Sequence, residues 1–88
     1  MAPDTEMFFY RTRSGMEADL ILETASGAVG LEIKHRPAVS PSDARSLRAI
    51  APSLGTRWRG GIVVYDGASL YALVPEHGIW AVPLHRLV

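Results

Sequence analysis

The stretch that decides the fold is residues 16–36, MEADLILETASGAVGLEIKHR. Its alternating side chains and its short polar segment with glycine predict two strands joined by a tight turn. In such a hairpin, residues whose numbers add up to 51 lie opposite each other. Asp19 then lies opposite Glu32, and Glu17 lies opposite Lys34.

The predicted turn spans four residues, 24–27, and each strand beside it has two different faces. The strand period of two separates an apolar face from a face that carries the charges. The apolar face contains Ala18, Leu20, Leu22, Val29, Leu31 and Ile33. The opposite face contains the four charged residues together with Ile21 and Gly30.

The opposed carboxylates of Asp19 and Glu32 repel each other and need a compensating cation. Lys34 can supply part of this charge, and Mg²⁺ or Mn²⁺ the rest, because these ions bind carboxylate and water oxygens. A metal-activated water beside a lysine is a route to phosphodiester hydrolysis. Spacing alone favours the alternative, a solvated sheet face on which the same charges form ordinary cross-strand ion pairs.

The run EADLIL, followed by a turn and GLEIK, resembles the core motif of the PD-(D/E)xK nuclease-like superfamily. That motif places an aspartate in one strand and (D/E)-x-K in the next. The lead-in FYRT at residues 9–12 and GMEAD at residues 15–19 resemble, more narrowly, the C-terminal domain of a prokaryotic family of AAA+ ATPases. In that family an ATPase domain and a winged-helix region precede a nuclease-like domain of unsettled function. The resemblance covers residues 8 to about 66.

This resemblance implies a restriction-endonuclease-like core and a set of site residues. Asp19 and Glu32 would be ligands of Mg²⁺ or Mn²⁺ and would act in catalysis with Lys34, and Glu17 would be an accessory metal ligand. The implied activity is metal-dependent hydrolysis of DNA. The alternative is a catalytically inactive interaction or regulatory domain of an AAA+ ATPase, and a third is a dimerising fold with no catalytic role.

The sequence departs from the family pattern in two ways, and both concern segments that it lacks. The helix that precedes the first strand in many active members, and contributes a further glutamate there, is missing, and the chain has no Gly-rich phosphate loop. We therefore expect residues 1–88 to be one nuclease-like domain, either a fragment or a minimal form without the first helix.

Length and composition narrow the function classes. The 88 residues suit one domain, with a stability of about 5 kcal/mol to which a homodimer or a partner domain would add. Nine basic and nine acidic residues exclude a binder of nucleic acid that acts through overall positive charge. The lack of cysteine excludes disulfides and thiolate chemistry. No apolar run reaches the roughly 18 residues of a membrane span and no signal peptide is recognisable, so a cytoplasmic location is expected.

The segment after the hairpin predicts the single helix. Ser40 suits the N-cap, Pro41 the first helical position and Asp43 the third, from which its carboxylate can reach back to the cap. Pro52 and Gly55 limit the helix to about three turns. Its apolar stripe consists of Ala44, Leu47, Ile50, Ala51 and Leu54.

The remaining apolar segments predict the other strands. Residues 7–13 favour a first strand, and residues 62–65 a strand that is buried on both faces and parallel to an earlier one through a right-handed crossover. Residues 70–74 and 79–84 predict a final hairpin. The expected fold is α/β, or α+β: a mixed sheet of five or six strands with one helix on one face, and an open second face for an adjoining domain or the missing helix.

Several basic residues have two interpretations. Arg11 and Arg13 are either solvated or in contact with phosphates beside the carboxylates. Residues 57–59, Arg-Trp-Arg, either contact a nucleic-acid backbone or place the tryptophan over the sheet edge, and the second is favoured. His35 lies next to the carboxylates in sequence, but strand parity turns it to the other face, which favours a structural or solvated role over metal binding.

Overall fold

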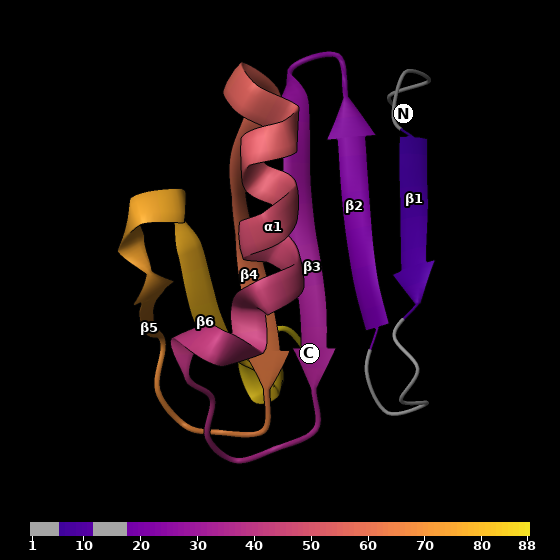
Figure 1. The fold of residues 1–88 in the computed structure, drawn as a ribbon. Coiled ribbons are helices and arrows are strands. Elements are labelled where there is room, and N and C mark those ends of the chain that lie inside the picture. Colours follow the sequence, from indigo (N-terminus) through magenta and orange to yellow (C-terminus); the bar gives the residue numbers. More distant parts are fainter. Residues whose placement is uncertain (1–5, 12–17) are drawn as a thin grey trace.

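One six-stranded mixed sheet, with a single α-helix on one of its faces, forms the fold (Figure 1). A computed structural model describes the backbone of residues 6–11 and 18–88 and the side chains of residues 20–88. The strand order is β1-β2-β3-β4-β6-β5. The strands are β1 (Glu6–Arg11), β2 (Ala18–Thr24), β3 (Gly27–Lys34), β4 (Trp58–Tyr65), β5 (Tyr71–Val74) and β6 (Ile79–Pro83).

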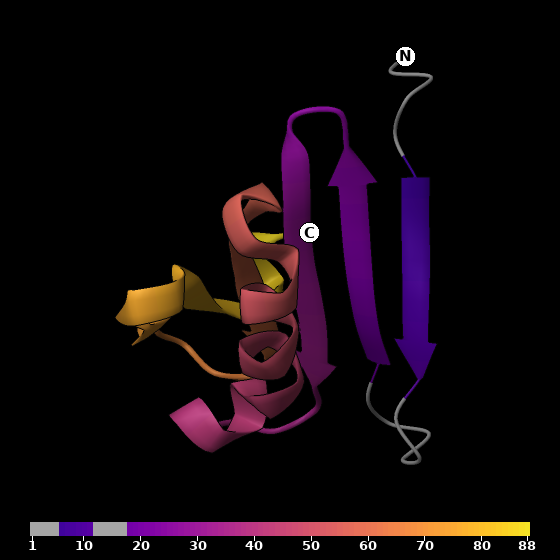
Figure 2. The ribbon, with the colours of Figure 1, turned by 45° about the horizontal axis from the view of Figure 1, so that its top comes forward.

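Strand directions follow from the connections. The neighbouring pairs β1–β2, β2–β3 and β5–β6 are antiparallel, whereas β3–β4 and β4–β6 are parallel. Helix α1 (Arg45–Leu54) connects β3 to β4 and packs against both strands (Figure 2). With α1 in front and β3 pointing down, β4 lies to the left of β3, so the crossover is right-handed, as predicted (Figure 1). The predicted α+β fold with a mixed sheet and one covering helix is confirmed.

The predicted register of the central hairpin is confirmed for residues 18–24 and 27–33. Residue pairs from Ala18 and Ile33 to Thr24 and Gly27 all add up to 51. The turn is shorter than predicted, however, because Thr24 and Gly27 still belong to the strands. Gly27 makes this possible: its φ of 146° is rarely adopted by residues with a side chain, and a Cβ there would lie 2.6 Å from Cγ of Arg59.

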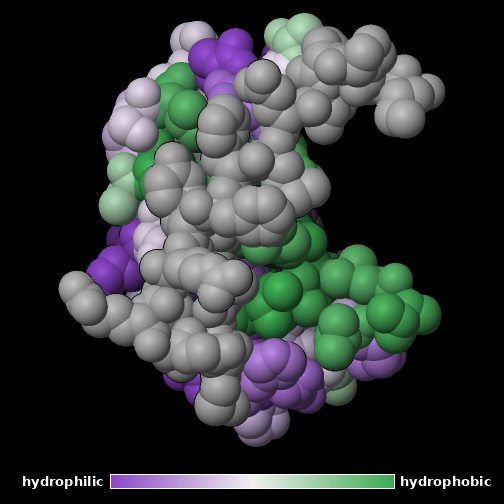
Figure 3. Space-filling model, turned by 90° about the vertical axis from the view of Figure 1, so that its right-hand side faces the viewer, coloured by the Kyte–Doolittle hydropathy of each residue, from purple (hydrophilic) through white to green (hydrophobic). Residues whose placement is uncertain are grey.

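The face of β3 that carries the charges is the buried one. Glu32 and Lys34 lie under α1, whereas Val29, on the apolar side, is 41% exposed. The solvated-face interpretation is therefore wrong for Glu32 and Lys34, because the helix covers the side that spacing alone assigned to water. Within the described residues no α-helix covers the sheet face away from α1, and apolar surface gathers on that side, at the lower right of Figure 3.

The helix begins as predicted. Residues Pro41–Ala44 form one 3₁₀ turn before α1, and the Ser40 amide donates a hydrogen bond of 2.7 Å to Oδ2 of Asp43. The end of the helix differs slightly from the prediction. Pro52 lies inside the last turn, and Gly55, with a φ of 56°, ends the helix. No helix within the described residues is long and apolar enough to cross a membrane.

Two sheet glycines allow the helix to approach β3 and β4 closely. Leu47, the fully buried residue of α1, and the ring of Trp58 lie over Gly30 and Gly61. A Cβ on Gly30 would lie 2.6 Å from Cδ2 of Leu47 and 2.8 Å from Cη2 of Trp58. The core therefore depends on the absence of side chains at these two positions.

Gly30→Ala should lower the free energy of unfolding by about 1–3 kcal/mol, since the added methyl overpacks the contact with Leu47. Urea unfolding measures this cost. In a Leu47→Val background, which lacks the clashing Cδ2 atom, the same substitution should cost less. Equal costs in the two backgrounds would show that Leu47 does not constrain this position.

Candidate functional site

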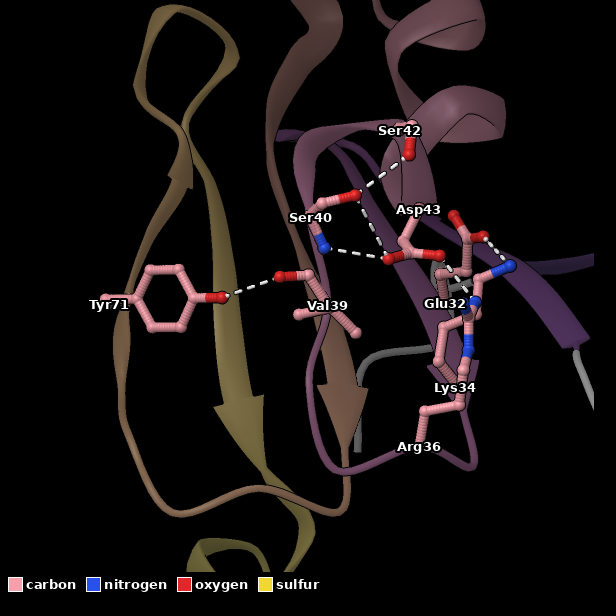
Figure 4. A network of polar contacts seen from close by, with 8 residues as sticks. All are labelled: Glu32, Lys34, Arg36, Val39, Ser40, Ser42, Asp43 and Tyr71. Atoms are coloured by element: carbon pink, nitrogen blue, oxygen red, sulfur yellow. Dashed lines mark hydrogen bonds and ion pairs between the residues drawn. The ribbon is translucent and has the colours of Figure 1, made fainter.

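A buried pair of opposite charges lies on β3, beneath the start of α1 (Figure 4). Nζ of Lys34 is 3.1 Å from Oε2 of Glu32, and the side chains are 10% and 2% exposed. The second carboxylate oxygen of Glu32, Oε1, is fully buried. Two residues apart on one strand, the side chains share a face, and the flanking strands β2 and β4 shield them from water at the sides.

The N-terminus of the helix adds a second pair next to the first. Arg36 Nη2 binds Asp43 Oδ1 at 2.5 Å, and the other oxygen of Asp43 accepts the Ser40 amide bond (Figure 4). Burial of the Asp43 carboxyl acts to raise its pKa, but the Ser40 hydrogen bond and the charges of Arg36 and Lys34 outweigh it, so the pKa lies below 3.8. The charge of Lys34 thus acts on Asp43 as well as on Glu32.

Tyr71, on edge strand β5, binds the other side of the loop that leads to the helix. Its hydroxyl donates to the Val39 carbonyl at 3.1 Å, and its ring meets that of Tyr65 edge-on, with centroids 6.4 Å apart. Burial, with smaller contributions from Tyr65 and Asp43, raises the pKa of Tyr71 above 10. The loop between β3 and α1 is therefore held at both ends, by Arg36 and Asp43 and by Tyr71.

The predicted carboxylates of β2 are placed only in part. Asp19 occupies the register position directly opposite Glu32, as predicted. The side chain of Asp19 and the whole of Glu17 lie outside the described residues, and so do the side chains of Arg11 and Arg13. The contacts among the carboxylates of β2 and β3 therefore stay a prediction.

Glu32 supplies the kind of donor that Mg²⁺ and Mn²⁺ prefer, a carboxylate held on a rigid strand. Among the described side chains, no three His, Cys, Asp or Glu residues lie close enough together to hold a metal ion. The register places one more carboxylate residue, Asp19, opposite Glu32. Two carboxylates with water in the remaining positions are a usual Mg²⁺ site, so these residues fit such an ion in type and number.

The two arginines of the Arg-Trp-Arg segment bind residues at the turn between β2 and β3. Arg57 forms an ion pair of 2.8 Å with Glu23, and Nε of Arg59 donates to the Ser26 carbonyl at 2.8 Å. Nε1 of Trp58 donates to the His77 carbonyl at 2.8 Å while the ring packs against the core. These contacts support a structural role for this segment, but the predicted position over the sheet edge is wrong, because the Trp58 ring lies over Gly30 and Gly61 on the interior strands β3 and β4.

His35 is half exposed, and its Nδ1 lies 3.8 Å from Oδ2 of Asp66. This position outside β3 agrees with the solvated role that strand parity favours. The sequence did not predict the ion pair between Arg36 and Asp43, and it indicated only a helix-capping role for Asp43. No pattern in the sequence pairs the two, because their contact depends on the path of the loop between them.

Asp43→Asn should destabilise the protein by about 1 kcal/mol at neutral pH, because it removes a cap acceptor and the partner of Arg36. The folded-state pKa of Asp43 lies below 3.8, so ionised Asp43 stabilises the fold above that pH and loses this effect as the pH falls through the folded-state pKa. Urea unfolding from about pH 7 to about pH 3 should show the two proteins converging in acid. Ser42→Ala is the control and should show a pH-independent change.

The Glu32–Lys34 pair should behave as a coupled unit. Lys34→Met leaves a buried carboxylate without its 3.1 Å contact and should cost about 3–5 kcal/mol, which approaches the whole stability of the domain. Glu32→Met/Lys34→Met should cost less than the sum of the single changes, as measured by thermal unfolding at several urea concentrations. Additive costs would contradict direct coupling.

Comparisons with known proteins give a family but no activity. Neither the curated proteins nor the solved structures contain a match to the chain. A family model described as DUF4143, a domain of unknown function, matches residues 2–87. Because this match spans nearly the whole sequence, the chain belongs to the DUF4143 family.

Proposed function

We propose that the domain carries a PD-(D/E)xK nuclease-like site that hydrolyses phosphodiester bonds in DNA with Mg²⁺ or Mn²⁺. The observation that supports this most is the buried Glu32–Lys34 pair on β3, with Asp19 opposite Glu32 in the register. These are the residues that the motif of the PD-(D/E)xK nuclease-like superfamily, (D/E)-x-K with an aspartate on the preceding strand, would assign to the site.

Stability alone is a weak reason for such a pair. Burying two charges costs desolvation energy that their attraction roughly offsets, and an apolar pair of similar volume is often equally stable. The neighbours of Glu32 and Lys34 on the same face, Ile21 and Val63, are buried and apolar, so an apolar pair would suit the layer. A requirement for charge in the chemistry accounts for the pair better than its contribution to folding does.

The position in the sheet also favours a functional site. The parallel strands β3, β4 and β6 end at the same edge of the sheet, and Lys34 is the last residue of β3. Ligands of open sheets with parallel strands bind outside the carboxyl ends of those strands. Lys34 therefore lies where the geometry of the sheet favours binding.

The residues would divide the work as follows. Glu32 and Asp19 would hold the metal ion, which lowers the pKa of a bound water and stabilises negative charge. Lys34 would orient the attacking water or offset the charge that develops on the phosphate oxygens. Asp43, which pairs with Arg36, would add a negative charge near Lys34, because it lies close enough for the lysine charge to lower its pKa.

The second candidate is a catalytically inactive interaction or regulatory domain of an AAA+ ATPase. Exposed apolar residues on the sheet face away from α1 favour it, because Val29 is 41% and Trp80 46% exposed there. A sheet face with exposed large apolar residues is typical of a surface that another domain or a second copy covers. Metal binding by the carboxylates and cleavage of DNA distinguish the two functions.

Calorimetric titration of Mn²⁺ and Mg²⁺ tests the metal site, with Glu32→Gln as the variant and Glu23→Gln as the control. Glu23 is a partly buried carboxylate that pairs with Arg57, outside the proposed site. We expect wild type and Glu23→Gln to bind Mn²⁺ and Glu32→Gln to lose binding. Equal binding by all three proteins would contradict the proposal.

Cleavage of labelled single- and double-stranded DNA tests the lysine. Lys34→Ala should abolish cleavage and keep most of the Mn²⁺ binding, and circular dichroism checks that it remains folded. Glu32→Gln, which is nearly isosteric, provides a second inactive variant if Lys34→Ala unfolds. Unchanged cleavage in either folded variant would contradict the proposed site, and an absence of Mn²⁺ binding in the wild type would favour the inactive domain.

A further inference from the structure

A hollow with a basic lining lies between α1 and the turn that joins β5 to β6. Its volume is about 410 Å³, and its lining residues are Ser42, Arg45, Arg48, Ala49 and His77. Three of these five residues carry, or can carry, a positive charge, and none is acidic. In a chain with equal numbers of basic and acidic residues, this is a local concentration of positive charge.

The two arginines of the hollow differ from those that stabilise the fold. Arg36, Arg57 and Arg59 each bind an acidic side chain or a backbone carbonyl. Within the part of the chain that the structure describes, Arg45 and Arg48 form neither an ion pair nor a side-chain hydrogen bond. Their guanidinium groups are therefore available to a ligand.

The wall opposite the helix is held in place. His77 lies in the 3₁₀ turn Pro75–His77, and its carbonyl accepts the hydrogen bond from Trp58 Nε1 at 2.8 Å. The next residue, Gly78, accepts a hydrogen bond of 3.1 Å from the Gly61 amide. Since Trp58 also packs against the core, the turn is fixed relative to α1 before any ligand binds.

We propose that this hollow binds a phosphate group in the backbone of a nucleic-acid strand. Arginine forks match phosphate oxygens in two-point contacts, and Arg45 and Arg48, one turn apart on the helix, can bind the same or neighbouring phosphates. The imidazole of His77 is the one aromatic ring among the lining residues, and no large apolar side chain accompanies it, so a free nucleotide would find only a small surface for its base. Contact through the backbone alone suits these residues better.

This site is separate from Glu32 and Lys34, so the inference does not depend on whether those residues cleave DNA. The hollow would hold a strand on the exposed side of the helix, through contacts that read no sequence. Such contacts make binding salt-dependent, because each phosphate that is neutralised releases counterions.

Fluorescence anisotropy with a labelled single-stranded oligonucleotide tests the proposal, with the 88-residue chain in EDTA so that no metal supports cleavage. The variants are Arg48→Gln and Arg45→Gln/Arg48→Gln, because glutamine keeps a high helix propensity. Arg86→Gln is the matched control, since Arg86 is exposed and lies outside the hollow. We expect Arg48→Gln to weaken binding about tenfold and to lower the salt slope by about 1, and the double variant to weaken it further. The control should bind as the wild type does.

Three results would overturn the inference: no saturable binding by the wild type, equal losses in Arg48→Gln and Arg86→Gln, or displacement of the oligonucleotide by low millimolar inorganic phosphate. The last would assign the hollow to free phosphate instead of a strand. The EDTA in this assay separates this proposal from the previous one, because the nuclease site needs a metal ion and binding at the hollow does not. Arginine-dependent binding without any Mn²⁺-dependent cleavage would contradict the nuclease and leave the hollow as a phosphate site.

Discussion

The burial of Glu32 and Lys34 under α1 is the constraint on which the rest of the structure depends. Two charges on a central strand can leave water only if they stay in contact, and this contact holds them 3.1 Å apart. The helix that covers them must also satisfy its own first turn, which Asp43 does together with Arg36. The same side chains thus cap the helix and surround the charged pair with further charge.

Close approach of the helix makes this burial possible. Leu47 reaches the sheet because Gly30 and Gly61 present no side chain, and Trp58 fills the space beside it. The indole also donates to the β5–β6 turn, so one residue joins the helix layer, the sheet and the C-terminal hairpin. The charged pair and the basic hollow lie against the same helix, and both depend on this packing.

Much of this could be predicted from local rules. The register of the hairpin follows from alternation and a tight turn, and the helix start follows from Ser40, Pro41 and Asp43. The side of the sheet that the helix covers does not follow, because alternation defines two faces without choosing between them. The predicted length of the turn was wrong because the unusual φ of Gly27 allows the strand pairing to continue to this residue. The contact between Arg36 and Asp43 was missed because it depends on the path of a loop.

The position of β6 has a consequence for synthesis of the chain. This strand comes last in sequence order, yet it lies inside the sheet, between β4 and β5. Until it is made, β4 presents an unpaired edge with the apolar residues 62–65, and β5 has no neighbour in the sheet. A ribosome that stops before Ile79 would therefore release a chain that is prone to aggregate, even though the charged pair and the helix above it are complete.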